Sequence, residues 1–72
     1  MSKTETVNHP AHYGAIPGIE CIDVVEHFNF NLGNVIKYVW RVGLKPGTDV
    51  KDDLKKAIWY LEREIERREN EN

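Results

Sequence analysis

The feature that most constrains the fold of this chain is an apolar repeat in its last third. Four side chains recur there at spacings of four and three residues: Leu54, Ile58, Leu61 and Ile65. This spacing is the period of one face of an α-helix. Asp49 is suited to cap the start of that helix. The sequence therefore predicts a long helix after Asp49, with the four side chains and Ala57 as the stripe that packs into the core.

Two shorter helices are predicted before the long one. Residues 19–28 and residues 32–42 both carry apolar side chains at helical spacing. Asn31 is expected to cap the second of these helices, and Pro46 and Gly47 form the turn that leads to the last one. The pattern predicts an all-α fold, a small three-helix domain.

The composition divides the chain into three parts. Residues 1–6 are polar and lack periodicity, which is typical of a flexible N-terminus. Residues 7–18 contain two prolines, two glycines, two histidines and a tyrosine. This mixture indicates an ordered arm, because a linker is usually richer in Ser, Gly or charge. Residues 19–72 then form the helical domain.

The length of the chain indicates that it assembles with other copies of itself. A chain of 72 residues buries only a modest core. Its single cysteine, Cys21, excludes an intrachain disulfide, and no His and Cys residues have zinc-finger spacing. Two Trp, three Tyr and two Phe are more aromatic side chains than three short helices can cover. We therefore expect a homo-oligomer.

The charge balance and hydropathy exclude two classes of partner. The chain has 10 Lys plus Arg against 12 Asp plus Glu, so it lacks the positive field of a general nucleic-acid binder. No apolar stretch approaches the roughly 20 residues of a membrane span, and we expect no membrane partner. The unpaired Cys21 fits a reducing compartment, and its place on an apolar helix face predicts a buried, inert thiol. These features predict a cytoplasmic protein.

A polar stripe on the second predicted helix offers the chemistry of an anion site. Its members recur at i, i+3, i+4 and i+7, and so project from one surface: Asn34, Lys37, Tyr38 and Arg41. An amide, an ammonium, a guanidinium and a phenol suit a phosphorylated ligand that carries a base or sugar. Lys45, just past the helix, adds a third cation. The alternative is a solvated face that only keeps the protein soluble.

The arm offers a second set of candidate binding residues. His9, His12 and Tyr13 lie around Pro10, whose ring stiffens the backbone and presents the side chains at low entropic cost. This arrangement suits a clamp over a ligand. The alternative is a packing loop in which the histidines satisfy backbone groups.

Carboxylates on the first predicted helix are the candidate metal ligands. Glu20 and Asp23 stand at i and i+3, a spacing that can hold Mg²⁺ or accept hydrogen bonds from a ribose. A site that also includes an arm histidine matches no closed zinc pattern. The alternative is that both carboxylates neutralise Lys37 and Arg41 in salt bridges. The chain has neither a G-x-x-x-x-G-K-[ST] nor a G-x-G-x-x-G motif, so no standard ATP-binding fold is expected.

Four segments resemble a known family: VNHPAHY, GIECIDVVE, FNLGNVIKYVWRxGLK and DLKKAIWYLEREI. Together they span residues 7–65. They resemble a small phage-encoded family that was long catalogued as a domain of unknown function and is often labelled nucleotide kinase. The resemblance implies a nucleotide ligand and highlights ten positions: His9, His12, Tyr13, Glu20, Asp23, Asn34, Lys37, Tyr38, Arg41 and Lys45.

The first functional hypothesis is a nucleotide-binding module. An oligomer captures a phosphorylated nucleotide at a subunit interface, with Lys37 and Arg41 on the phosphate and the arm folded over it. Lys55, Lys56 and Tyr60 can close the site from a neighbouring subunit. Phage proteins of this size resemble sponges that sequester nucleotide signals of host immunity, which would place the protein in the cytoplasm of an infected bacterial host.

Two alternatives come from other functional classes. The resemblance implies a nucleoside monophosphate kinase that works without a P-loop, with Mg²⁺ held by Glu20 and Asp23. The exposed aromatics instead suggest a protein–protein adaptor that inhibits a host enzyme. The three hypotheses predict different fates for a nucleotide, which is retained, phosphorylated or not bound at all.

Overall fold

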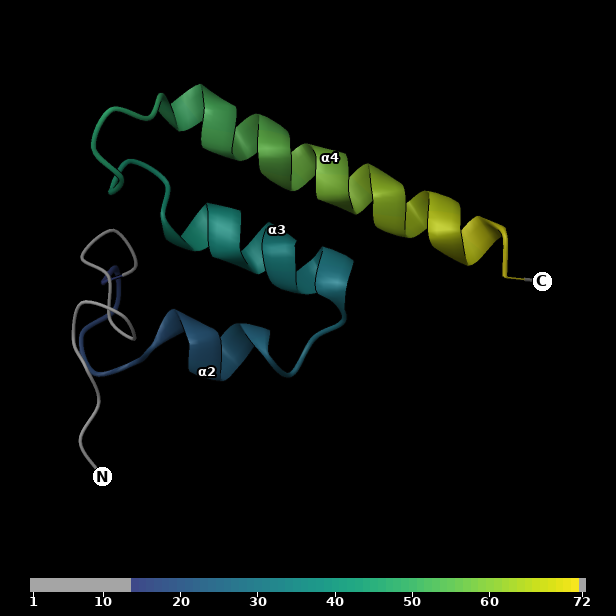
Figure 1. Ribbon diagram of the computed structural model, residues 1–72, viewed down its shortest axis with the longest axis horizontal. Helices are drawn as coiled ribbons and strands as arrows, with labels where there is room; N and C mark the ends of the chain where they lie inside the picture. The colour runs from purple at the N-terminus through teal and green to yellow at the C-terminus, as the bar shows by residue number, and fades with distance from the viewer. Residues whose placement is uncertain (1–13, 72) are drawn as a thin grey trace.

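The computed structural model describes residues 14–71, and this part of the chain holds three helices and no strand (Figure 1). The helices are α2 (Cys21–Val25), α3 (Phe30–Trp40) and α4 (Val50–Glu69). The all-α prediction is confirmed for these residues. The predictions for the N-terminus and for most of the arm concern residues 1–13, which lie outside the described part. Within residues 14–71, no helix is both long and apolar enough to cross a bilayer.

Side-chain caps mark the starts of α3 and α4. Asp49 caps α4 as predicted, since its side chain accepts a hydrogen bond from the backbone N–H of Lys51 at 2.9 Å. The cap of α3 is Asn29, which accepts from the N–H of Leu32 at 2.9 Å. The prediction that Asn31 is this cap was wrong. Asn29 has the extended backbone that a cap requires, and the helix begins one residue later.

The two shorter helices differ from their predicted bounds. α2 ends at Val25, because the N–H groups of His27 and Phe28 bond three residues back and tighten the chain into a turn. α3 ends at Trp40 and is followed by a turn that contains Gly43. The φ of Gly43 is +76°, a left-handed conformation that residues with a Cβ rarely adopt.

The three helices lie side by side in a single layer. α3 runs between α2 and α4 and contacts both (Figure 1). Close packing of α2 on α3 depends on Gly33, where a Cβ would come within 3.2 Å of the carbonyl oxygen of Val25. Viewed down the shortest axis of the molecule, no described helix lies above or below another (Figure 1).

The apolar repeat of α4 does not form the core of this layer. Its four side chains are 42 to 58% exposed: Leu54, Ile58, Leu61 and Ile65. The prediction that they pack into the core was therefore wrong for the single chain. The buried positions of α4 are Asp53, Ala57 and Glu64, which lie at the same helical spacing on a different face. Among residues 14–71, the buried apolar side chains are Ala57 and the predicted Cys21.

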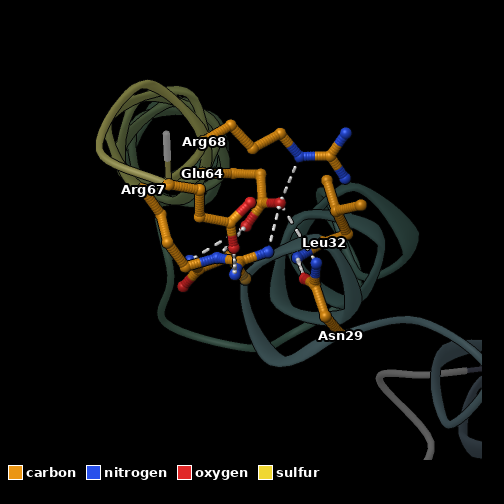
Figure 2. A network of polar contacts seen from close by, with 7 residues as sticks. Asn29, Leu32, Glu64, Arg67 and Arg68 are labelled. Atoms are coloured by element: carbon orange, nitrogen blue, oxygen red, sulfur yellow. Dashed lines mark hydrogen bonds and ion pairs between the residues drawn. The ribbon is translucent and has the colours of Figure 1, made fainter.

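The Glu64 carboxylate joins α4 to the start of α3 (Figure 2). Its Oε2 accepts from Asn29 at 3.1 Å, from Arg67 at 2.9 Å and from Arg68 at 2.6 Å. Its Oε1 accepts from Asn31 and from a second Arg67 nitrogen, both at 3.2 Å. Hydrogen bonds from Arg67 and then Arg68 hold the pKa of Glu64 far below its usual range, and Glu64 raises the pKa of Arg67.

We expect the Glu64→Gln substitution to lower the free energy of unfolding at neutral pH and to make that free energy less sensitive to acid. The lowered pKa of Glu64 means that the charged form stabilises the fold above the unfolded pKa of about 4.3, and that this contribution is lost as the pH falls toward the folded pKa. Urea unfolding followed by circular dichroism, near pH 7 and near pH 3, measures both effects. Glu66→Gln removes only an exposed pair with Arg63 and serves as the control. Identical pH profiles for the Glu64→Gln variant and the wild type would contradict this role.

Candidate functional site

The ring of Tyr38 lies at the centre of a group of cationic and aromatic side chains from α3 and α4. The guanidinium carbon of Arg41 is 4.4 Å from the ring centroid, and the Nζ atoms of Lys37 and Lys56 are 5.0 and 5.4 Å from it. The ring of Tyr60 stacks on Tyr38 with 5.9 Å between centroids and 16° between planes. These five side chains are called the Tyr38 cluster below. Because two helices contribute, the cluster forms only when α3 packs on α4.

Arg41 is the buried member of the cluster. Its Nε donates to Oδ1 of Asp53 at 3.1 Å, and the two residues are 5% and 0% exposed. Asp53 Oδ2 has no hydrogen-bond partner among the described residues. Burial removes both charges from water, so each depends on the other for its stabilisation. Arg41 therefore places a guanidinium beside the Tyr38 ring, with its charge offset by Asp53, and joins the end of α3 to the first turns of α4.

Lys37 and Lys56 are the cations of the cluster without a carboxylate partner. Neither forms an ion pair with any carboxylate in residues 14–71. Lys37 is half-buried on α3 and Lys56 is exposed on α4. The aromatic ring attracts their charge only weakly at exposed sites. Two ammonium groups beside one ring form a local positive site that attracts an anion.

An aromatic surface continues from the cluster along α4. Phe30 and Trp59 contact Tyr60 edge to face, at centroid distances of 6.0 and 5.0 Å. Both are solvent-facing, with 76% of Phe30 and 57% of Trp59 exposed. They line an open pocket of about 530 Å³ together with Asn29, Asn31, Tyr60, Arg63 and Arg67. This surface offers a planar ligand aromatic contacts beside the positive site.

The other predicted binding residues lie outside the Tyr38 cluster or outside the described residues. Asn34 is half-buried on α3, where its side-chain amide donates to the carbonyl oxygen of Phe30 at 2.8 Å. Lys45 is exposed in the loop after α3. Three members of the predicted clamp are not among the described residues: His9, His12 and Tyr13.

The candidate metal ligands Glu20 and Asp23 lie at the start of α2. Glu20 is the N-cap residue of α2, but its side chain makes no capping hydrogen bond, and Asp23 is exposed within the helix. In the described part of the chain, no group of three or more His, Cys, Asp or Glu residues is placed to hold a metal ion. Neither carboxylate pairs with Lys37, and Arg41 forms an ion pair with the α4 residue Asp53. The salt-bridge alternative therefore fails for Lys37, and for Arg41 it stays a prediction.

Cys21 is buried between the helices, as its position on an apolar face predicted. Burial raises the pKa of its thiol, and the nearby positive charge of Lys37 opposes that rise. A raised pKa keeps the thiol protonated and poorly nucleophilic.

Sequence reasoning missed how α4 contributes to the site. Lys56 and Tyr60 were expected to act from a neighbouring subunit, whereas they contact Tyr38 of their own chain. The pairing of Arg41 with Asp53 was not predicted. A signal for it exists, because Asp53 and Tyr60 belong to a second helical stripe with Ala57 and Glu64.

Comparison with known proteins identifies the family. A family described as a protein of unknown function, DUF3310, matches residues 7–62. The match covers most of the chain and every member of the Tyr38 cluster, and the chain belongs to this family. No curated protein and no solved structure matches the chain.

We expect the Arg41→Ala substitution to destabilise the protein much more than Lys37→Ala. Removal of Arg41 leaves Asp53 charged and buried, which costs about 3–5 kcal/mol for a buried pair, whereas Lys37 has no ion-pair partner to strand in the described structure. Loss of Lys37 removes a half-buried side chain and one cation–π contact, which is worth about 0.5–1 kcal/mol. Thermal unfolding followed by circular dichroism compares the two variants. Equal unfolding midpoints would show that the Arg41–Asp53 pair does not support the fold.

Proposed function

We propose that this member of the DUF3310 family binds a phosphorylated nucleotide at the Tyr38 cluster. The observation that carries the proposal is the pair of ammonium groups, Lys37 and Lys56, beside one aromatic ring. They come from different helices, and neither has a carboxylate partner among residues 14–71. A bound phosphate would supply the missing negative charge, and it would accept hydrogen bonds from both lysines.

Arg41 supports phosphate binding by holding the two helices together. Its guanidinium is 4.4 Å from the Tyr38 centroid and is ion-paired with Asp53 of α4, which offsets its charge. The pair therefore keeps Lys37 and Lys56 at one site. The two lysines are the groups that we place in direct contact with phosphate, because an ammonium on a flexible stem adapts to the position of the ligand.

The aromatic surface of α4 is suited to the base. Lys56 and Tyr60 are about one helical turn apart, and Trp59 lies beside Tyr60 on the same turn. A nucleotide whose phosphate contacts Lys56 can therefore place its base against exposed aromatic rings. Stacking on such rings tolerates different bases, while the phosphate fixes the orientation of the ligand.

The remaining elements of the proposal concern retention of the ligand. We place His9, His12 and Tyr13 as a clamp over the bound nucleotide, with Asn34 and Lys45 as further polar contacts. We also propose that the protein forms homo-oligomers and holds the ligand without converting it. The resemblance to small phage-encoded proteins supports a role in sequestering a nucleotide signal of a bacterial host.

A nucleotide that binds the folded protein should raise its unfolding midpoint by about 5–10 °C near saturation, through mass action. The test is a thermal-shift screen with nucleoside mono-, di- and triphosphates, cyclic nucleotides and ADP-ribose, each with and without Mg²⁺. Each stabilising compound is then recovered and analysed. Recovery unchanged supports retention. A phosphorylated product would overturn retention in favour of a kinase, and the absence of any stabilising nucleotide would overturn the proposal and favour a protein–protein adaptor.

Lys37→Ala and Lys56→Ala should each weaken binding of the best nucleotide about 10-fold, because each removes a charge-assisted contact to phosphate. Affinity should also fall with added salt, which screens exposed charges. Isothermal titration calorimetry measures both effects. Lys51→Ala is the matched control, since this lysine lies on the first turn of α4, the helix of Lys56, and forms no ion pair or cation–π contact with a described residue. Equal losses in all three variants would show that binding depends on overall charge alone.

A further inference from the structure

We infer that two copies of this chain associate through the apolar repeat of α4, with the two α4 helices antiparallel. The interface is formed by Leu54, Ile58, Leu61 and Ile65, called the α4 seam below. The inference rests on the self-association part of the proposed function and names its surface. It does not require a nucleotide.

The spacing of the α4 seam is that of a coiled coil. Steps of four, three and four residues place Leu54 and Leu61 at d positions of a heptad, with Ile58 and Ile65 at a positions. All four side chains are 42 to 58% exposed in the single chain. They point about 100° around α4 from the face that meets α3. A second helix can therefore pack on the seam without displacing α3.

The described helices do not cover the apolar surface of α4 with a second layer. Helices α2, α3 and α4 lie side by side (Figure 1), and Ala57 and Cys21 are the buried apolar side chains in residues 14–71. Stable domains usually bury apolar faces between two packed layers, and a chain of this size needs some addition to its own core. A second copy packed on the seam supplies that layer.

The charges beside the seam favour a second copy in antiparallel orientation. Lys55 and Glu62 both follow d positions, on the outer side of the seam, and neither forms an ion pair within residues 14–71. When Ile58 lies opposite the partner subunit's Leu61, Lys55 lies opposite the partner subunit's Glu62. Two-fold symmetry makes this pair twice. The seam is thus apolar, and the charges beside it complement those of a second copy.

A parallel arrangement offers no such complementarity. In a parallel coiled coil, each e position, which follows d, lies opposite a g position of the partner, which precedes a. Glu62 would then face the partner subunit's Ala57, and Glu69 would face the partner subunit's Glu64, which are like charges. The antiparallel orientation is therefore the one that the sequence of α4 supports.

The α4 seam lies about half a turn around the helix from Lys56. Association through it leaves the Tyr38 cluster open, so seam variants and cluster variants test different surfaces. A Lys55→Glu substitution should not remove a phosphate contact, and Lys56→Ala should not alter the dimer.

The test is sedimentation equilibrium of the full chain and of charge variants, with folding checked by circular dichroism. We expect the wild type to sediment at twice the 8.4 kDa of one chain. Lys55→Glu and Glu62→Lys should each weaken the dimer about 10-fold, because each replaces two attractive pairs with two repulsive ones. The double variant should restore the dimer. Residues 55 and 62 are two helical turns apart, so rescue cannot arise from a contact within one chain.

Leu61→Asp provides the second measurement. A charge in the centre of the seam should convert the dimer into a monomer or abolish folding, while the charge-swap variants retain the apolar seam. A folded wild-type monomer at micromolar concentration would overturn the inference, as would a dimer that is insensitive to both single charge reversals. Thermal-shift data with the nucleotides of the previous section, on the same variants, distinguish failure of the seam from failure of nucleotide binding.

Discussion

Buried polar contacts between α3 and α4 determine how the rest of the structure is arranged. Arg41 pairs with Asp53 near the start of α4, and Glu64 accepts hydrogen bonds from Asn29 and Asn31 near its end. Together they fix the rotation of α4 about its own axis relative to α3. Charged groups in such an interface require matched partners, so the polar face of α4 must meet α3. The apolar face is consequently turned toward solvent.

The contacts that orient α4 against α3 are therefore different from the contacts that usually supply most of a protein's stability. Buried ion pairs and hydrogen bonds specify which faces meet, but their net contribution is modest because both groups lose contact with water. Removal of apolar surface from water is the larger favourable contribution in most folds. In this chain most of that surface remains exposed on α4, at residues such as Ile58 and Ile65. Association of two copies would provide the missing burial without changing the α3–α4 contacts.

The sequence predicted α4 well because caps and spacing act locally. The Asp49 cap and the apolar repeat located this helix, and Asn34, Lys37 and Tyr38 lie on α3 as predicted, with Arg41 at its C-cap. Hydrophobic periodicity shows that a helix has an apolar face, but it does not tell whether that face meets the same chain or another copy. The sequence also did not show that Lys37 and Arg41 have different roles. Arg41 pairs with the buried carboxylate of Asp53, which belongs to a helix that is distant in the sequence, and Lys37 has no carboxylate partner in residues 14–71.

Nucleotide binding and dimer formation are proposed for opposite sides of α4, and both depend on the stability of this helix. A phosphate between Lys37 and Lys56 would join α3 to α4 at the same interface that Arg41 and Asp53 hold, and would offset the repulsion between the two ammonium groups. A second copy on the opposite flank would stabilise α4 itself. Each event favours the folded α3–α4 pair that the other requires, so each should strengthen the other by mass action even though the ligand and the partner touch different side chains.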